Sequence, residues 1–276
     1  MITVTPNKEF ILSTNTTGYV FRVLPTGQLE HLYYGKKLRF WEDYSDLEVL
    51  LPKREFAPGN TIAYDVQHPA LAMEDTCLEV SSYGKGDLRS PLVTICHGDG
   101  GRTSDFQFDS YTVEPGKPER KTLPGSYAEQ AGHAEQSAGG EQTGCERACE
   151  TLHLVLKEVH YQFRMDLYYT VFEAEDVITR YADLTNESEE DAVIERFLSL
   201  QLDLAPGTES AYDAIFFDGA WAREMQPYRV PLGHGMHVNR SMTGTSSNRA
   251  NPFFMVTERN TTEDAGTCYG FNLIYS

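Results

Sequence analysis

Apolar and polar residues alternate along most of this chain, and this period of two is the strongest constraint on its fold. Leucines occupy every second position in 152–156, and large apolar residues do the same in 163–169. Successive side chains of a β-strand point to opposite faces, so this pattern indicates half-buried strands. We find no amphipathic helix longer than two turns. The sequence therefore predicts an all-β fold: a large antiparallel β-sandwich (supersandwich) with two extended sheets and few short helices.

Turn residues predict how some of these strands connect. Residues 17–24 alternate, Pro25-Thr26-Gly27 can form a turn, and 29–34 returns, which is typical of a hairpin. A glycine-rich segment between 92–96 and 103–108 predicts a second hairpin. The segments 177–184 and 193–204 are predicted as further strands, as are the shorter segments 223–225 and 237–242.

Two regions lack regular periodicity. Residues 36–90 carry several prolines and acidic residues, and we expect long loops with short strands there. Residues 127–149 are rich in Ala, Gly, Gln and Glu without an apolar pattern, and we expect a flexible surface insertion.

Charge and cysteine content narrow the class of protein. The net charge of −18 argues against nucleic acid and anionic membranes as partners, because phosphate binding needs a basic face. It suits a neutral substrate. The five cysteines have no regular spacing, which does not indicate a disulfide framework. The N-terminus has no signal-peptide pattern and no apolar run is long enough to span a membrane, so we expect a cytoplasmic protein.

No motif marks a catalytic centre. The 41 acidic residues form many neighbouring pairs, and none stands out as an acid–base pair. His234 and His237 lie in a glycine-rich loop or strand, and Cys145 and Cys149 have no partner pair, so neither set predicts a metal site. A nucleophile elbow and a phosphate-binding glycine motif are both absent. We therefore assign no catalytic residue, metal or cofactor to this chain.

Three segments mix an aromatic residue or proline with Arg, Asp or Asn near a glycine: 86–91, 219–224 and 246–254. Such mixtures suit a sugar site or an interface with another domain, because aromatic faces stack on sugars while planar polar groups bind hydroxyls. Turn packing within the domain is the alternative interpretation.

These segments resemble the N-terminal domain of the family 36 glycoside hydrolases, the bacterial α-galactosidases. The resemblance is colinear from about residue 8 to residue 276. It rests on Tyr83-Gly84-Lys85-Gly86-Asp87-Leu88-Arg89-Ser90-Pro91, Thr103-Ser104-Asp105-Phe106, Leu167-Tyr168-Tyr169-Thr170-Val171-Phe172, Gly219-Ala220-Trp221-Ala222-Arg223-Glu224, Asn251-Pro252-Phe253-Phe254 and Tyr269-Gly270-Phe271, with shorter matches between them.

The resemblance implies that 1–276 is the N-terminal β-sandwich domain of a longer glycoside hydrolase. A catalytic (β/α)8 barrel is expected after 276, and the alternating pattern that reaches Ser276 without a turn agrees with this. In the family, two barrel aspartates carry out retaining hydrolysis of terminal α-galactosyl residues in melibiose and raffinose sugars, without a cofactor. The parent enzyme would thus act on galactosides, and this fragment alone would be inactive.

The family also implies roles for particular residues. The N-terminal domain would pack on its own barrel, form contacts in a homo-oligomer such as a tetramer, and supply the rim of the sugar pocket. Substrate-binding positions are then expected at Arg54, Glu55, Asp87 and Arg89. Positions at the domain interface are expected at Trp221, Arg223, Glu224, Asn251 and Phe253. Alternatives left open are a stand-alone carbohydrate-binding or assembly module without catalysis, and a related parent such as a phosphorylase with a similar sandwich.

Overall fold

The computed structural model describes residues 1–39, 43–50, 63–69, 71–85, 89–118, 149–204, 212–244 and 249–274. The chain divides into two compact units. Unit 1 comprises Met1–Pro118 and Tyr127–Ala205, and unit 2 comprises Glu119–Ser126 and Pro206–Ser276.

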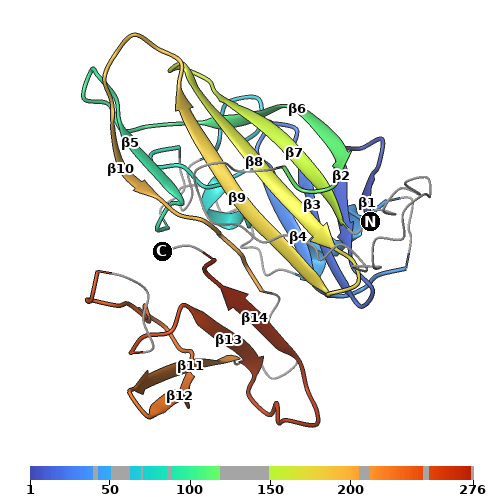
Figure 1. Cartoon of the computed structure of the whole chain (residues 1–276). Coiled ribbons are helices and arrows are strands. Elements are labelled where there is room, and N and C mark those ends of the chain that lie inside the picture. The colour runs from blue at the N-terminus through green and yellow to red at the C-terminus, as the bar shows by residue number, and fades with distance from the viewer. Residues whose placement is uncertain are drawn as a thin grey trace, which may run out of the picture. The chain divides into compact units, whose positions relative to one another are not determined.

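Unit 1 is built on two four-stranded antiparallel sheets (Figure 1). The first contains, in order, β1 (Ile2–Val4), β2 (Glu9–Ser13), β3 (Thr17–Val23) and β4 (Leu29–Lys36). The second contains β6 (Phe106–Pro115), β7 (Cys149–Glu158), β8 (Phe163–Phe172) and β9 (Val177–Asn186). A two-stranded sheet pairs β5 (Val93–Cys96) with β10 (Val193–Phe197). Two short 3-10 helices, η1 (Ser45–Leu50) and η2 (Met73–Asp75), lie between β4 and β5.

The two four-stranded sheets of unit 1 form a sandwich, because their inward residues share one hydrophobic core. Phe10 and Phe21 of the first sheet and Leu154 and Leu167 of the second are completely buried in this core. The ring of Phe21 lies 5.2 Å from that of Tyr169 across the interface. Burying these alternating side chains is the main force that holds the two sheets together. The predicted all-β sandwich is confirmed.

Unit 2 has one antiparallel sheet in the order β12 (Arg223–Pro231), β11 (Tyr212–Ala220), β13 (Phe253–Glu258) and β14 (Cys268–Asn272). An aromatic ladder crosses all four strands. Phe216 contacts Tyr228 on one side and stacks on Phe254 on the other, and Phe254 stacks on Phe271. Each of these contacts joins residues that are paired directly across neighbouring strands, which is where side-chain pairs stabilise a sheet.

Several strand predictions are confirmed. The hairpin at Pro25-Thr26-Gly27 joins β3 to β4, and Gly27 adopts a φ of 94°, which glycine favours. The alternating segments after residue 150 form β7, β8 and β9. β1 and β2 carry no prediction in the sequence analysis, although both join the first sheet.

Other predictions are wrong. The predicted second hairpin does not form: β5 pairs with β10 and β6 pairs with β7, although the intervening turn is closed by a bond from the amide of His97 to the carbonyl of Gly101. The predicted strand 193–204 ends at Phe197, and 237–242 is not a strand. Within the described part of 36–90, the chain forms 3-10 helices and isolated bridges in place of short strands after Lys36. Residues 127–148 of the predicted insertion lie outside the described residues, and Cys149 begins β7.

Across the described ranges, no helix has the length and apolar character needed to cross a membrane.

Candidate functional site

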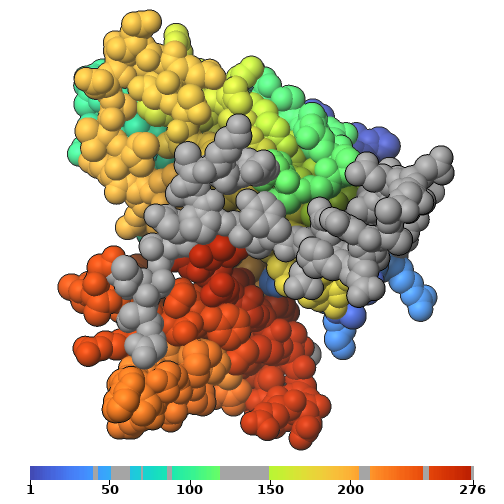
Figure 2. Space-filling view, in the orientation of Figure 1, coloured from blue at the N-terminus to red at the C-terminus, as the bar shows by residue number. Residues whose placement is uncertain are grey.

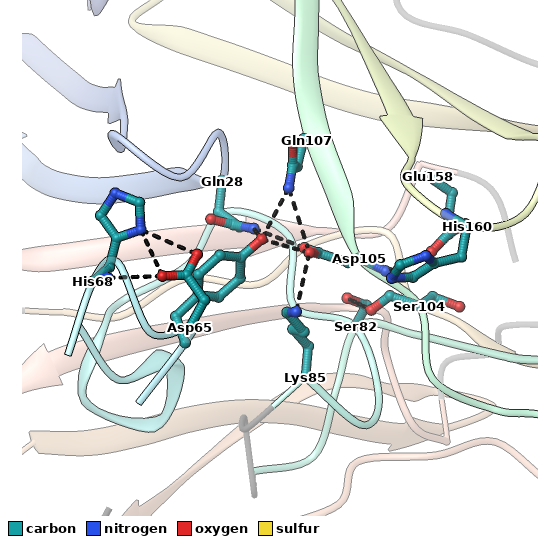
Figure 3. Close-up of polar contacts among 11 residues, drawn as sticks. Gln28, Asp65, His68, Ser82, Lys85, Ser104, Asp105, Gln107, Glu158 and His160 are labelled. Atoms are coloured by element: carbon teal, nitrogen blue, oxygen red, sulfur yellow. Dashed lines mark hydrogen bonds and ion pairs between the residues drawn. The ribbon is translucent and has the colours of Figure 1, made fainter. Parts of the chain in front are cut away.

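A buried carboxylate, Asp105, gathers polar side chains from four separate segments of unit 1 (Figure 3). Gln28 Nε2 donates to Asp105 Oδ1 over 2.7 Å, and the Tyr64 hydroxyl donates to Oδ2 over 2.6 Å. Gln107 Nε2 makes a longer bond of 3.4 Å to Oδ2, and the ammonium of Lys85 lies 3.8 Å from the same oxygen. We call these five residues the Asp105 cluster.

Lys85 and Tyr64 also contact each other directly. The Lys85 ammonium lies 4.4 Å from the centre of the Tyr64 ring, in the geometry of a cation–π interaction. Burial and the hydrogen bond to Asp105 raise the pKa of Tyr64 to about 12, so its hydroxyl stays protonated and continues to donate at neutral pH. The cluster therefore holds the segments around 64 and 85 against the start of β6.

A second carboxylate, Glu158 at the end of β7, extends this network. Its Oε1 accepts the amide of Asp105 over 2.9 Å, and its Oε2 accepts the amides of His160 and Tyr161 (Figure 3). A carboxylate that accepts several backbone N–H groups satisfies donors which the turn would otherwise leave unpaired. Glu158 thus fixes the β7–β8 turn to the start of β6.

The backbone conformation at Gly84 allows residues 82–84 to lie against residues 103–104. Gly84 has a φ of 93°, and a Cβ there would lie 2.5 Å from Thr103 Oγ1 and 3.0 Å from its Cα. Only glycine permits this approach without strain. Alongside it, the Ser104 amide donates to the Tyr83 carbonyl over 3.1 Å, and the Ser82 hydroxyl donates to the Ser104 carbonyl over 2.6 Å.

The predicted substrate-binding residues fall in two groups. Arg54, Glu55 and Asp87 lie outside the described residues. Arg89 is half-buried, and its guanidinium donates to the carbonyls of Met73 over 3.2 Å and of Thr76 over 2.6 Å. It therefore ties its own segment to helix η2. Lys85 and Arg89 stand on either side of 86–88, and the structure anchors both of them.

The predicted interface residues gather at one end of the unit 2 sheet. Trp221, 91% exposed, lies in the β11–β12 hairpin turn with Arg223 and Glu224 beside it. Asn251 lies at the same end, because its amide donates to the Phe217 carbonyl over 3.1 Å and its side chain contacts Met225 Sδ. Phe253 then begins β13, with its ring 5.5 Å from that of Phe217.

The hairpin turn that carries Trp221 is well defined. Ala222, the second residue of this two-residue turn, has a φ of 60°, as the second central position of a type II turn requires, and its amide donates to Glu224 Oε1 over 2.9 Å. The turn thus holds an almost fully exposed indole away from the sheet. Tryptophan is enriched among the residues that contribute most to protein–protein binding.

Sequence reasoning missed the polar arrangement around Asp105. Gln28 and Tyr64 were not singled out, and Asp105 and Lys85 appeared only inside motifs quoted for the resemblance. The signal that could have found the cluster was the presence of two such motifs, 83–91 and 103–106, which the structure places in contact. Gln28 and Tyr64 carry no comparable local signal.

The two carboxylates of this network hold segments of the fold together. Asp105 and Glu158 are both buried, and both accept hydrogen bonds from donors of the protein itself. A general acid or base must instead reach a proton of the substrate. Among the described residues there is also no group of three or more His, Cys, Asp or Glu side chains that could hold a metal ion.

Comparison with a family model and with known proteins identifies the same group of relatives. Residues 27–276 match the family model described as the glycosyl hydrolase family 36 N-terminal domain. Alpha-galactosidase 1 of Pediococcus pentosaceus is 31% identical over 275 residues, which cover 98% of this chain and 34% of that protein. The chain therefore spans about a third of the length of this relative.

Solved structures agree with the sequence match. The crystal structure of the α-galactosidase from Lactobacillus brevis superposes with a TM-score of 0.84 at 31% identity, covering 99% of this chain and 34% of that one. A variant of the α-galactosidase AgaA from Geobacillus stearothermophilus, solved in complex with raffinose, superposes with a TM-score of 0.79 at 28% identity, covering 95% of this chain and 33% of that one.

Proposed function

This chain belongs to glycosyl hydrolase family 36, as the N-terminal domain of that family, and we propose that it serves as the non-catalytic N-terminal domain of an α-galactosidase. The complete enzyme would remove terminal α-D-galactosyl residues from melibiose and raffinose sugars with retention of configuration. The catalytic aspartates would belong to a (β/α)8 barrel that follows residue 276.

One observation carries this proposal: almost the whole chain aligns with α-galactosidases, and it accounts for about a third of their length. The raffinose complex of the AgaA variant supports galactosides as the ligand class. Two features of the chain itself are consistent with the assignment. The net charge of −18 suits a neutral substrate, and two buried carboxylates, Asp105 and Glu158, are engaged in holding the fold.

Within the complete enzyme, unit 1 would contribute the rim of the sugar pocket. The proposed contacts are Arg54, Glu55, Asp87 and Arg89. The Asp105 cluster supports this role because Tyr64 and Lys85, which it anchors, come shortly after 54–55 and shortly before 87 in the chain. Fixing a loop at its ends lowers the conformational entropy that it loses when substrate binds.

Unit 2 would contribute a contact with the barrel domain through Trp221, Arg223, Glu224, Asn251 and Phe253. Their location at one end of a single sheet supports a common contact surface. We also propose that the enzyme is a homo-oligomer, with a tetramer as one form, and that it acts in the cytoplasm without a cofactor.

Hydrolysis of an aryl α-galactoside tests the proposal. The purified 276-residue chain should release no more aryl alcohol than a mock preparation, because the paired acids would lie elsewhere. The chain extended through the rest of its own reading frame should be active on the aryl galactoside and on raffinose. Activity of the isolated chain would contradict the proposed division of labour, and an inactive, folded extended protein would contradict the enzyme assignment.

A further inference from the structure

A pocket of about 360 Å³ opens in unit 1, and Arg89, the one described residue of the proposed rim, is not among the residues that line it. Three turns line it: 97–98 after β5, 160–163 between β7 and β8, and 188–192 before β10. Figure 2 shows the gold surface around β10 next to the teal surface around β5, at the end of unit 1 where these strands pair. The volume is within the range of small-molecule sites. We call it the His97 pocket.

One wall of the His97 pocket is a fixed aromatic stack. The His97 and Tyr161 rings are nearly parallel, 3° apart, with their centres separated by 3.5 Å. His97 is buried, and its Nε2 lies 2.9 Å from Ser104 Oγ, while the Tyr161 hydroxyl donates to Asp99 Oδ2 over 3.0 Å. Tyr161 is half-exposed, although His97 covers one face of its ring.

The opposite wall is an acidic turn that its own hydrogen bonds hold in place. Asn186 Oδ1 accepts the Ser188 amide over 3.0 Å, and Asn186 Nδ2 donates to the Glu190 carbonyl over 2.8 Å. Glu189 and Asp191 are exposed and, within the described part of the chain, form no hydrogen bond or ion pair. Their carboxylates are therefore available as acceptors on a preformed backbone.

A glycine lets the acidic turn approach the segment after β5 closely. A Cβ on Gly98 would lie 2.8 Å from Glu190 Oε2 and 3.3 Å from the Asp191 carbonyl oxygen. Gly98 has no positive φ that would require glycine for conformational reasons. Adding a methyl group here would therefore displace the Glu190 carboxylate, which lines the pocket, without removing any polar group.

These walls match the chemistry of a neutral sugar. An aromatic face stacks on the C–H face of a sugar ring, carboxylates accept hydrogen bonds from hydroxyls, and the Gln162 amide and His160 ring can donate. Glu189, Glu190 and Asp191 would repel an anion. Burial lowers the pKa of His97, so the aromatic wall is neutral at pH 7.

We propose that the His97 pocket is a non-catalytic binding site for a neutral monosaccharide or the terminal ring of an oligosaccharide. This site is additional to the proposed rim of the catalytic pocket, and its occupancy does not depend on the barrel domain. Its effect would be to hold saccharide on the N-terminal domain.

The test is a titration of the isotope-labelled 276-residue chain with D-galactose and, separately, with raffinose. The chemical shifts of the backbone amides, measured by NMR, report binding. Shifts should saturate and should concentrate at 97–98, 160–163 and 188–192. Gly98→Ala and Tyr161→Leu should each weaken binding by at least about fivefold, which corresponds to about 1 kcal/mol. Gly233→Ala is the matched control, because a Cβ there meets nothing within 4 Å, and its affinity should equal that of the unchanged chain.

Several results would overturn the proposal. The first is amide shifts that do not saturate below about 100 mM sugar. The second is shifts at residues outside the pocket. The third is an affinity for sugar that is the same in both pocket variants as in the unchanged chain. A titration with calcium chloride separates the alternative ligand class: saturable shifts at the same residues with calcium and none with sugar would identify a cation site instead. Amide spectra recorded without ligand check that the Gly98→Ala variant remains folded. If that variant is unfolded, the affinity of Tyr161→Leu alone decides whether sugar binds in the pocket.

Discussion

Glu79 and His31 form a contact of 2.7 Å between Oε1 and Nδ1 in the interior of the unit 1 sandwich, where both side chains are almost completely buried. The same carboxylate accepts the hydroxyls of Tyr19 and Tyr169 over 2.7 Å each. Arg180 donates its Nε to the Tyr169 hydroxyl over 3.0 Å and so adds a cation to the network. A buried carboxylate is tolerated here because its oxygens have partners from both sheets.

The Glu79 network predicts an acid-sensitive contribution to stability. Burial by itself raises the pKa of Glu79, but the interactions with His31 and Arg180 and the bond from Tyr169 outweigh it, so the net pKa lies below the ordinary value of 4.5. The network therefore stabilises the fold fully above pH 4.5, and this contribution is lost as the pH falls through the folded-state pKa. Denaturant unfolding measured from pH 7 to pH 3 should show the loss.

Glu79→Gln should remove most of that pH dependence. At pH 7 we expect it to lower the free energy of unfolding by about 3–5 kcal/mol, because Arg180 loses its buried counter-charge. The exposed Glu175→Gln is the control and should leave the profile unchanged. A Glu79→Gln protein that keeps the acid-limb slope of the unchanged chain would contradict the assignment.

Asp105→Ala should loosen two segments at once. The buried Gln28 and the half-buried Tyr64 would lose their acceptor, which should cost about 2–3 kcal/mol in unfolding free energy. Hydrogen exchange should accelerate at the amides of 63–69 and 83–85 more than elsewhere. Asp109→Ala, which removes an exposed pair with Lys157, should change both quantities much less. Equal effects of the two substitutions would show that Asp105 has no special anchoring role.

Two glycines with positive φ allow the stability cost of backbone strain to be measured separately from the cost of a steric clash. Gly100 has a φ of 83° and open space around its Cβ position, so Gly100→Ala should cost only the strain of about 1–2 kcal/mol. Gly84 has a φ of 93° and would also clash with Thr103, so Gly84→Ala should cost clearly more. Thermal unfolding of the two variants measures the difference. A larger loss for Gly100→Ala would show that residues 84 and 103 do not pack closely.

Trp221→Ala tests the proposed contact of unit 2. In the isolated chain its 91% exposed side chain should contribute little, so the thermal midpoint should hardly move. In the chain extended through its reading frame, the indole should be buried at an interface. The same substitution should then lower the free energy of unfolding by about 2 kcal/mol or more. Met236→Ala, 80% exposed in the same unit and outside the predicted surface, is the control. Identical behaviour of both variants in the extended protein would place the contact elsewhere.

Strands were predictable where the local pattern was sufficient. β7, β8 and β9 follow one another along the chain, and each alternates because one face is buried against the opposite sheet. The β3–β4 hairpin was predictable for a similar reason, since its turn residues lie between its two strands. β5 was expected to pair with the segment that follows it, but its partner β10 lies about a hundred residues later, and alternation does not encode which partner a strand selects.

The candidate site residues also fall into two groups: those that local sequence indicates and those that only the fold brings together. Arg89 and Trp221 could be selected from local composition, and the resemblance gave them a context. The Asp105 cluster could not be derived, because Gln28, Tyr64 and Lys85 are ordinary residues in their own segments and acquire a role only when the fold brings them to one carboxylate. The His97 pocket likewise joins three turns that are remote in sequence.

Alternation and turn chemistry, which act over a few residues, were thus enough to specify an all-β chain whose strands bury one face. Folding in three dimensions decided the strand partners, the buried ionic network at Glu79 and the meeting of motifs at Asp105. The physical reason is the range of the forces: hydrophobic periodicity and backbone preference operate locally, whereas a buried charge is stable only when partners from distant segments arrive together.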